Sequence, residues 1–139
     1  MIVLDTNVLS ELMRSAPDAS VMNWVATQSA ANLFVTTITQ AEILHGVLLL
    51  PRGRRRDAIE AAADAMFEED FAGRILPFSS LAAHAYAEIA VARRQAGRPI
   101  SQFDAQIAAI AKSSGANVAT RNVPDFEGCG IKVIDPWQS

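Results

Sequence analysis

The sequence has a single cysteine, Cys129, among its 139 residues. One thiol cannot form a disulfide within the chain and cannot supply a cysteine-based zinc site. An unpaired thiol is typical of proteins in a reducing compartment, so we expect this protein in the cytoplasm.

Segments that direct a chain to or across a membrane are also missing. The first five residues lack the basic stretch and the cleavage site of a signal peptide. No apolar run approaches the roughly 18 residues that a membrane span needs. We therefore expect a protein that is neither exported nor inserted into a membrane.

An excess of positive charge is absent as well, because 12 Lys and Arg stand against 15 Asp and Glu, a net charge of −3. Nucleic-acid binding would therefore need a local basic cluster. One cluster is present, and it consists of Arg52, Arg54, Arg55 and Arg56. It is either a solvated turn between helices or a contact surface for RNA phosphates.

Several motifs of large enzyme classes do not occur. The glycine patterns of dinucleotide and nucleoside triphosphate sites are absent, as is the serine-hydrolase elbow. Glu42 and His45 match half of a di-iron site, but no second copy exists, so we interpret His45 as an ordinary helix residue. Trp24 and Trp137 lack interleaved basic residues and are expected to pack rather than to stack on bases.

What the sequence does contain is a regular alternation of short apolar runs and helical patterns. With 139 residues, 50% of them hydrophobic, we expect one domain over residues 1–139. Strands are predicted at Ile2–Leu4, Leu33–Val35, Ile75–Phe78, Val118–Thr120 and Lys132–Ile134. Helices are predicted at Val8–Arg14, Val21–Gln28, Gln40–Leu50, Arg56–Ala72, Leu81–Ala96 and Gln102–Ser114. Parallel strands need crossover helices, so the expected fold is a three-layer α/β/α sandwich with a mainly parallel central sheet.

Two acidic residues follow predicted strands. Asp5 ends the first strand, and Asp125 comes shortly after the strand that precedes Asn122. In open α/β sheets, ligands bind outside the carboxyl ends of the strands. The alternative for each residue is an ordinary acid in a turn.

Two further acids begin predicted helices. Thr39 and Glu42 have the spacing of a capping box, and Ser101 and Asp104 have the same spacing with Asp in place of Glu. Each acid also lies at the rim of an apolar helix face, from which it could line a cleft. Capping and cleft lining are both open from the sequence.

A doubly wound sheet could bring these four acids to one edge. Four carboxylates without a counter-ion would repel one another and raise one another's pKa. Oxygen ligands without His or Cys favour a hard divalent ion, Mg²⁺ or Mn²⁺. Such ions can activate water and stabilise an in-line phosphoryl displacement.

The ordered motifs resemble the PIN-domain ribonucleases, specifically the VapC-like and FitB-like toxins of type II toxin–antitoxin systems. The matching segments are Ile-Val-Leu-Asp5-Thr-Asn, Thr37-Ile-Thr-Gln-Ala-Glu42-Ile-Leu-His-Gly, Phe103-Asp104-Ala-Gln-Ile-Ala, Ala119-Thr-Arg-Asn122-Val-Pro-Asp125-Phe and Val133-Ile-Asp-Pro-Trp137. The resemblance implies a PIN-like fold and endonucleolytic RNA cleavage that depends on Mg²⁺ or Mn²⁺. It also implies that Asp5 and Asp104 hold the metal directly, while Glu42 orients water or completes the metal's shell.

The resemblance leaves the fourth acid open. Some family members carry Asp where this chain has Asn122, whereas others have the Asn-x-x-Asp-Phe form found here. Either Asp125 completes the site, or the site has three acids and an amide. The hydroxyls of Thr6 and Thr120 are candidates for the water network around the metal.

The partners that the resemblance implies are an RNA substrate, a second copy of the chain in a homodimer, and a small antitoxin. The antitoxin would wrap the groove and block the acidic pocket, in a larger hetero-oligomer if both contacts form. A function of another class is also open, namely a noncatalytic module on the same fold that binds a metal or a phosphate.

Overall fold

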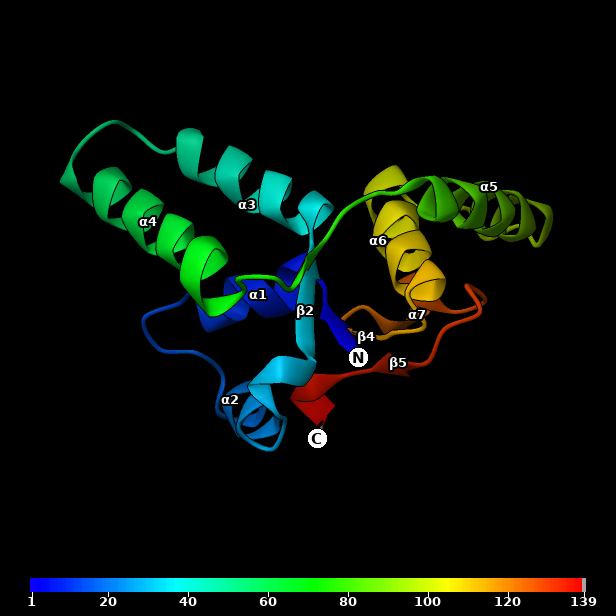
Figure 1. The fold of residues 1–139 in the computed structure, drawn as a ribbon, viewed down its shortest axis with the longest axis horizontal. Coiled ribbons are helices and arrows are strands. Elements are labelled where there is room, and N and C mark those ends of the chain that lie inside the picture. The colour runs from blue at the N-terminus through cyan, green and yellow to red at the C-terminus, as the bar shows by residue number, and fades with distance from the viewer. Residues whose placement is uncertain (139) are drawn as a thin grey trace.

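The computed structural model describes residues 1–138 and contains one central five-stranded sheet (Figure 1). The strand order is β3-β2-β1-β4-β5, and all four neighbouring pairs are parallel. The strands are β1 (Ile2–Leu4), β2 (Leu33–Thr36), β3 (Ile75–Leu76), β4 (Asn117–Ala119) and β5 (Val133–Ile134). Because β1 lies in the middle, the residue that follows it sits at the centre of the sheet's carboxyl edge.

Helices connect every pair of strands along the chain. The α-helices are α1 (Thr6–Leu12), α2 (Ala19–Ala26), α3 (Thr37–Leu48), α4 (Arg54–Ala65), α5 (Ser80–Gln95), α6 (Gln102–Ser113) and α7 (Val123–Phe126). Short 3₁₀ or π turns are η1 (Ala30–Asn32), η2 (Met66–Asp70) and η3 (Pro136–Gln138). No helix within residues 1–138 is long and apolar enough to cross a membrane.

Alternating side chains of β1 separate two hydrophobic cores. Ile2 and Leu4 pack on one face of the sheet with buried residues of α1 to α4. Val3 faces the other side and packs with buried residues of α5, α6 and α7. This alternation is the pattern expected when both faces of a parallel sheet are covered. The predicted α/β/α sandwich is therefore confirmed, and the sheet is parallel throughout.

Local chemistry explains where the elements differ from the prediction. β3 ends at Leu76 rather than at Phe78, since Pro77 has no N–H to donate to a sheet. α3 begins at Thr37 rather than at Gln40, because the Thr36 side chain accepts a hydrogen bond from the backbone N–H of Thr39 at 3.1 Å.

The predicted helix over Arg56–Ala72 is two elements. It starts earlier, at Arg54, after Gly53 adopts a φ of 152° that side chains of L residues rarely reach. It then widens into η2, where the N–H of Phe71 donates to the carbonyl of Met66 five residues before it. The short helix α7 has no counterpart in the prediction.

Candidate active site

Asp5 is at the centre of the carboxyl edge of the sheet. Its Oδ1 accepts a hydrogen bond from the backbone N–H of Val8 at 3.0 Å, and its own N–H donates to the carbonyl of Ala119 at 3.0 Å. The side chain therefore caps α1, as the turn interpretation of this residue expects. Only 3% of Asp5 is exposed, so the same side chain is also a buried acid.

Burial changes the acidity of Asp5. It raises the pKa of Asp5 from 3.8 to about 6, and the negative charge of Asp104 adds to the rise. Hydrogen bonds from the Thr120 side chain and from the backbone of Val8 lower the pKa in part. Asp5 and Asp104 therefore interact electrostatically although they are far apart in the sequence.

Asp104 lies in the first turn of α6. The hydroxyl oxygen of Ser101 accepts a hydrogen bond from the backbone N–H of Asp104 at 3.2 Å and caps the helix. The Asp104 carboxyl is half-buried, and burial raises its pKa. The hydrogen bond with Ser101 lowers the pKa of Asp104 in part, the negative charge of Asp125 raises it further, and the positive charge of Arg93 lowers it. Asp104 is thus the residue that links Asp5 to Asp125.

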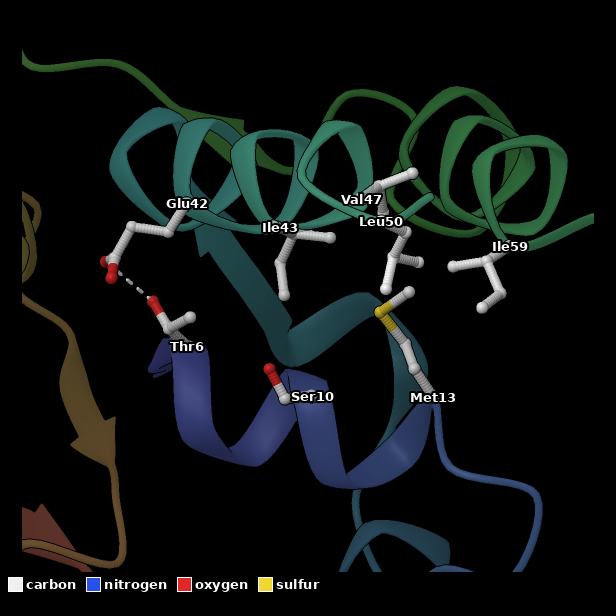
Figure 2. A pocket seen from close by; sticks show the side chains of 9 residues that line it. Thr6, Ser10, Met13, Glu42, Ile43, Val47, Leu50 and Ile59 are labelled. Atoms are coloured by element: carbon white, nitrogen blue, oxygen red, sulfur yellow. Dashed lines mark hydrogen bonds between the residues drawn. The ribbon is translucent and has the colours of Figure 1, made fainter. Parts of the chain in front are cut away.

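Glu42 is in the second turn of α3 and faces α1. The Thr6 hydroxyl donates to Glu42 Oε1 at 2.9 Å (Figure 2). Thr6 Oγ1 is also 2.9 Å from Thr39 Oγ1. A hydroxyl has one proton, so Thr39 donates to Thr6 and Thr6 to Glu42. The capping box suggested for Thr39 and Glu42 is wrong, since Thr36 caps this helix and Glu42 is turned toward Thr6.

Asn122 and Asp125 line different hollows of the surface. Asp125 shares a cavity of about 120 Å³ with Asp104 and Arg93. Asn122 lines a larger pocket that also contains Asn7. Thr120 is fully buried, and its Oγ1 accepts from the backbone N–H of Asn122 at 3.0 Å.

A groove extends from the Glu42 side of the site between α1, α3 and α4 (Figure 2). Its volume is about 340 Å³. It is lined by Thr6, Ser10, Met13, Glu42, Ile43, Gly46, Val47, Leu50 and Ile59. The groove is therefore polar at the Thr6 and Glu42 end and mostly apolar beyond it.

The arginine cluster Arg52–Arg56 does not join the acids. It occupies the turn between α3 and α4 and the start of α4, at the far end of this helical hairpin (Figure 1). α3 is 12 residues long, which corresponds to about 18 Å at a rise of 1.5 Å per residue. Arg52, Arg54 and Arg55 are exposed and Arg56 is partly buried.

The two tryptophans differ in their surroundings. Trp24 is buried in the core, as expected from the sequence. Trp137 packs at the edge of the same core, but its ring also lies 5.0 Å from the guanidinium carbon of Arg121. No sequence pattern indicated this pair, because the two residues are in different segments of the chain.

The carboxylates can be tested for their fit to a divalent metal. Within residues 1–138, no three His, Cys, Asp or Glu side chains already form a cluster that could hold a metal ion. The acids interact instead as pairs, Asp5 with Asp104 and Asp104 with Asp125. Mg²⁺ is commonly bound by one or two carboxylates, with water and substrate phosphates completing its shell. The Asp5 and Asp104 pair fits an ion bound in this way.

Three relatives are similar over nearly the whole chain. The plasmid stability protein StbB of Pseudomonas syringae pv. tomato is 42% identical over 139 residues, covering 100% of both chains. The VapC ribonuclease Y4jK of Sinorhizobium fredii is 38% identical over 138 residues, covering 99% of both. The toxin FitB of Neisseria gonorrhoeae is 36% identical over 137 residues, again covering 99% of both.

The fold comparison agrees with the sequence comparison. A crystal structure of FitAcB from Neisseria gonorrhoeae matches with a TM-score of 0.94 and 36% identity, covering 100% of both chains. The family model for the PIN domain matches residues 2–125, a segment that contains Asp5, Glu42, Asp104 and Asp125. The chain therefore belongs to the PIN domain family.

Proposed function

We propose that this protein is an endoribonuclease that depends on Mg²⁺ or Mn²⁺ and acts as the toxin of a toxin–antitoxin pair. The observation that carries the proposal is the buried Asp5, whose pKa is raised to about 6 beside Asp104 at the carboxyl edge of a parallel sheet. A buried acid and a half-buried acid that repel each other are destabilising unless a cation joins them. Relatives named as a ribonuclease and as a toxin, similar over the whole chain, support this function.

Asp5 and Asp104 would hold the metal in this mechanism. When bound, a divalent ion supplies Lewis-acid stabilisation of the phosphodiester under attack. The hydrogen bond from Thr6 orients Glu42, whose Oε1 is thereby occupied and whose other oxygen stays available to orient a water or accept its proton. Asp125 interacts with Asp104 and is the candidate for the fourth acid, while Thr120 holds the Asp5 carboxyl in place.

The groove beside Glu42 suits a small antitoxin. Beyond Thr6 and Glu42 its lining is mostly apolar, with Met13, Ile43, Val47, Leu50 and Ile59. An amphipathic helix could cover this surface. A basic side chain reaching the acids would relieve their repulsion and compete with the metal. In this proposal the protein forms a homodimer, alone or within a larger complex with the antitoxin. It acts on RNA in the cytoplasm.

The decisive experiment measures RNA cleavage by the purified protein with Mg²⁺, with Mn²⁺ and with excess EDTA. We expect fragments with either metal and none with EDTA. Asp104→Asn should lower the rate at least about a hundredfold, since even outer-shell partners of a metal contribute 10–100-fold. The matched control is Asp64→Asn, the same change at an exposed site on α4, which should cleave like the parent.

Two outcomes would contradict the proposal. Unchanged cleavage in EDTA would exclude a metal mechanism. Metal binding without cleavage of any cellular RNA would instead favour the noncatalytic metal- or phosphate-binding module. The toxin role is tested separately, because expression of the chain should slow growth, Asp5→Asn should not, and a small protein encoded beside it should restore growth.

A further inference from the structure

A polar pocket lies next to the apolar groove, with which it shares Ser10. Its volume is about 460 Å³, within the range of roughly 300–1,000 Å³ typical of ligand pockets. It is lined by Asn7, Ser10, Glu11, Arg14, Arg121, Asn122 and Trp137. We call it the Arg121 pocket. Three segments form it, namely α1 with the turn that follows it, the turn after β4 and the chain around η3.

Arg121 is the residue that gives this pocket its character. Its guanidinium lies over the Trp137 ring at 5.0 Å, and the residue is exposed. Within residues 1–138 no hydrogen bond or ion pair engages the Arg121 side chain. A guanidinium that rests on an aromatic face keeps the N–H groups of its edge free, already oriented for a phosphate.

Arg14 also lines the pocket and supplies a second positive charge. Its Nη1 lies 3.2 Å from Glu11 Oε2, and the Arg14 side chain is 67% exposed. The Glu11 carboxylate is buried and also accepts from the backbone N–H of Asp18 at 3.0 Å. Glu11 therefore anchors Arg14 and neutralises one of the two arginines, so the pocket has a net positive charge in a chain of net charge −3.

The pocket is connected to the acids through its two asparagines. Asn7 comes two residues after Asp5 in the chain. The backbone N–H of Asn122 donates to the hydroxyl of Thr120, which in turn bonds the Asp5 side chain. A polyanion bound across the acidic edge would therefore enter the Arg121 pocket on this side. Asparagine amides offer both donors and acceptors to the edges of bases.

We infer that the Arg121 pocket is a subsite for single-stranded RNA, which holds a nucleotide next to the bond at the acidic edge. Arg121 binds the phosphate, Arg14 adds to the attraction, and Asn7 and Asn122 face the base or sugar. The inference rests on the proposed function for its substrate. It also explains how an acidic protein with an acidic site retains a polyanion there.

The test compares binding of a short, fluorescein-labelled single-stranded RNA of mixed sequence at several salt concentrations. All proteins carry Asp5→Asn, so that the RNA stays intact. Arg121→Gln should weaken binding about fivefold or more and should reduce the slope of log affinity against log salt by about 0.7, the share of one phosphate on a single strand. Arg121→Lys, which keeps the charge, should retain the slope.

The matched control is Lys132→Gln, which removes one positive charge from an exposed site just before β5, at the amino end of the sheet. It should bind RNA like the parent. An equal loss in both variants would overturn the subsite, because net charge alone would then explain the effect. Unchanged RNA binding by Arg121→Gln would overturn the subsite too. If Arg121→Gln bound RNA normally but lost a co-purifying antitoxin, the pocket would be a binding site for the antitoxin and not for RNA.

Failure of the subsite and failure of the proposed function give different results. If the chain with Asp5 intact cleaves RNA but Arg121→Gln binds RNA normally, only the subsite is wrong. If that chain cleaves no RNA with Mg²⁺ or Mn²⁺ while Arg121→Gln weakens RNA binding with a reduced slope, the subsite stands and the nuclease function is wrong.

Discussion

Thr6 Oγ1 donates a hydrogen bond of 2.9 Å to Glu42 Oε1 and so joins α1 to α3 across 36 residues of sequence (Figure 2). Thr39 supplies the other contact of the Thr6 hydroxyl. The first turn of α1 follows Asp5 directly, so one short segment provides a buried acid and also the group that orients a second acid. The hydroxyl of Thr6 thus holds the orientation of the Glu42 carboxylate next to the segment of Asp5.

Replacing that hydroxyl tests its role. Thr6→Val keeps the shape of the side chain but leaves Glu42 without its donor, and we expect the rate of RNA cleavage to fall about tenfold. Thr6→Ser keeps the donor and should cleave nearly like the parent. Stability should change by only about 1 kcal/mol, the usual contribution of one hydrogen bond. Equal cleavage rates for the Val and Ser variants would contradict the orienting role.

Asp5→Asn should stabilise the protein without metal at neutral pH. Folding raises the pKa of Asp5 from 3.8 to about 6, so the folded state loses stability as the pH rises through this window and the loss is complete above it. The shift corresponds to roughly 3 kcal/mol at most. Asparagine can still accept the Val8 N–H as a cap, so the variant avoids this loss.

Urea unfolding in EDTA at two pH values measures this effect. The gain of Asp5→Asn over the parent should be present at pH 8 and should vanish below about pH 3, where Asp5 is protonated in both states. A variant that is less stable than the parent at pH 8 would show that the Asp5 carboxylate has a structural role only.

Asp125→Asn should reduce the cleavage rate at saturating RNA more than Asn122→Ala does. Asp125 interacts electrostatically with Asp104 and shares a cavity with it, whereas Asn122 faces the Arg121 pocket. Asn122→Ala is therefore expected to raise the KM for RNA rather than to lower kcat. Steady-state kinetics distinguishes the two effects, and the reverse ranking in kcat would assign the fourth position of the site to Asn122.

Arg93→Met should destabilise the fold by about 3 kcal/mol. The Arg93 side chain is buried in α5 and donates to the carbonyls of Arg98 at 2.6 Å and of Asp125 and Glu127 at 2.8 Å. A hydrogen bond to a charged donor contributes about 1.5–3 kcal/mol, and its loss leaves the acceptors unpaired. In chemical denaturation, the free energy of unfolding of Arg93→Lys should fall between those of the parent and of Arg93→Met. An Arg93→Met variant as stable as the parent would contradict the role of Arg93 in holding the segment that carries Asp125.

The arginine cluster of the hairpin gives a separate prediction. Replacing Arg54, Arg55 and Arg56 together by Gln should reduce the salt slope of RNA binding by about 1–2, if the RNA extends along α3 to the turn. Lys132→Gln again provides the control. A slope equal to that of the parent would make the cluster a solvated turn, which is the other interpretation of its sequence.

Much of the fold could be predicted because the relevant information is local. Three consecutive apolar residues followed by Asp5 define a buried strand and its end, and the alternation of such runs with helical patterns implies a parallel sheet with two covered faces. The ordered set of short motifs along the chain was likewise sufficient for the family resemblance. The boundaries of α3 and α4 were less accurate, since Thr36 and Thr39 are both plausible caps and the π turn η2 has no simple sequence pattern.

The sequence by itself therefore determined the layered architecture, because helical and strand periodicity act over a few neighbouring positions. Its motifs also predicted the acidic residues of the site. Only the tertiary structure decided which side chains meet. Glu42 turns to Thr6 rather than to its own helix cap, Arg121 rests on Trp137, and Arg93 holds the segment of Asp125. These contacts join segments that pack together only after the sheet has formed, so no local pattern of residues could specify them.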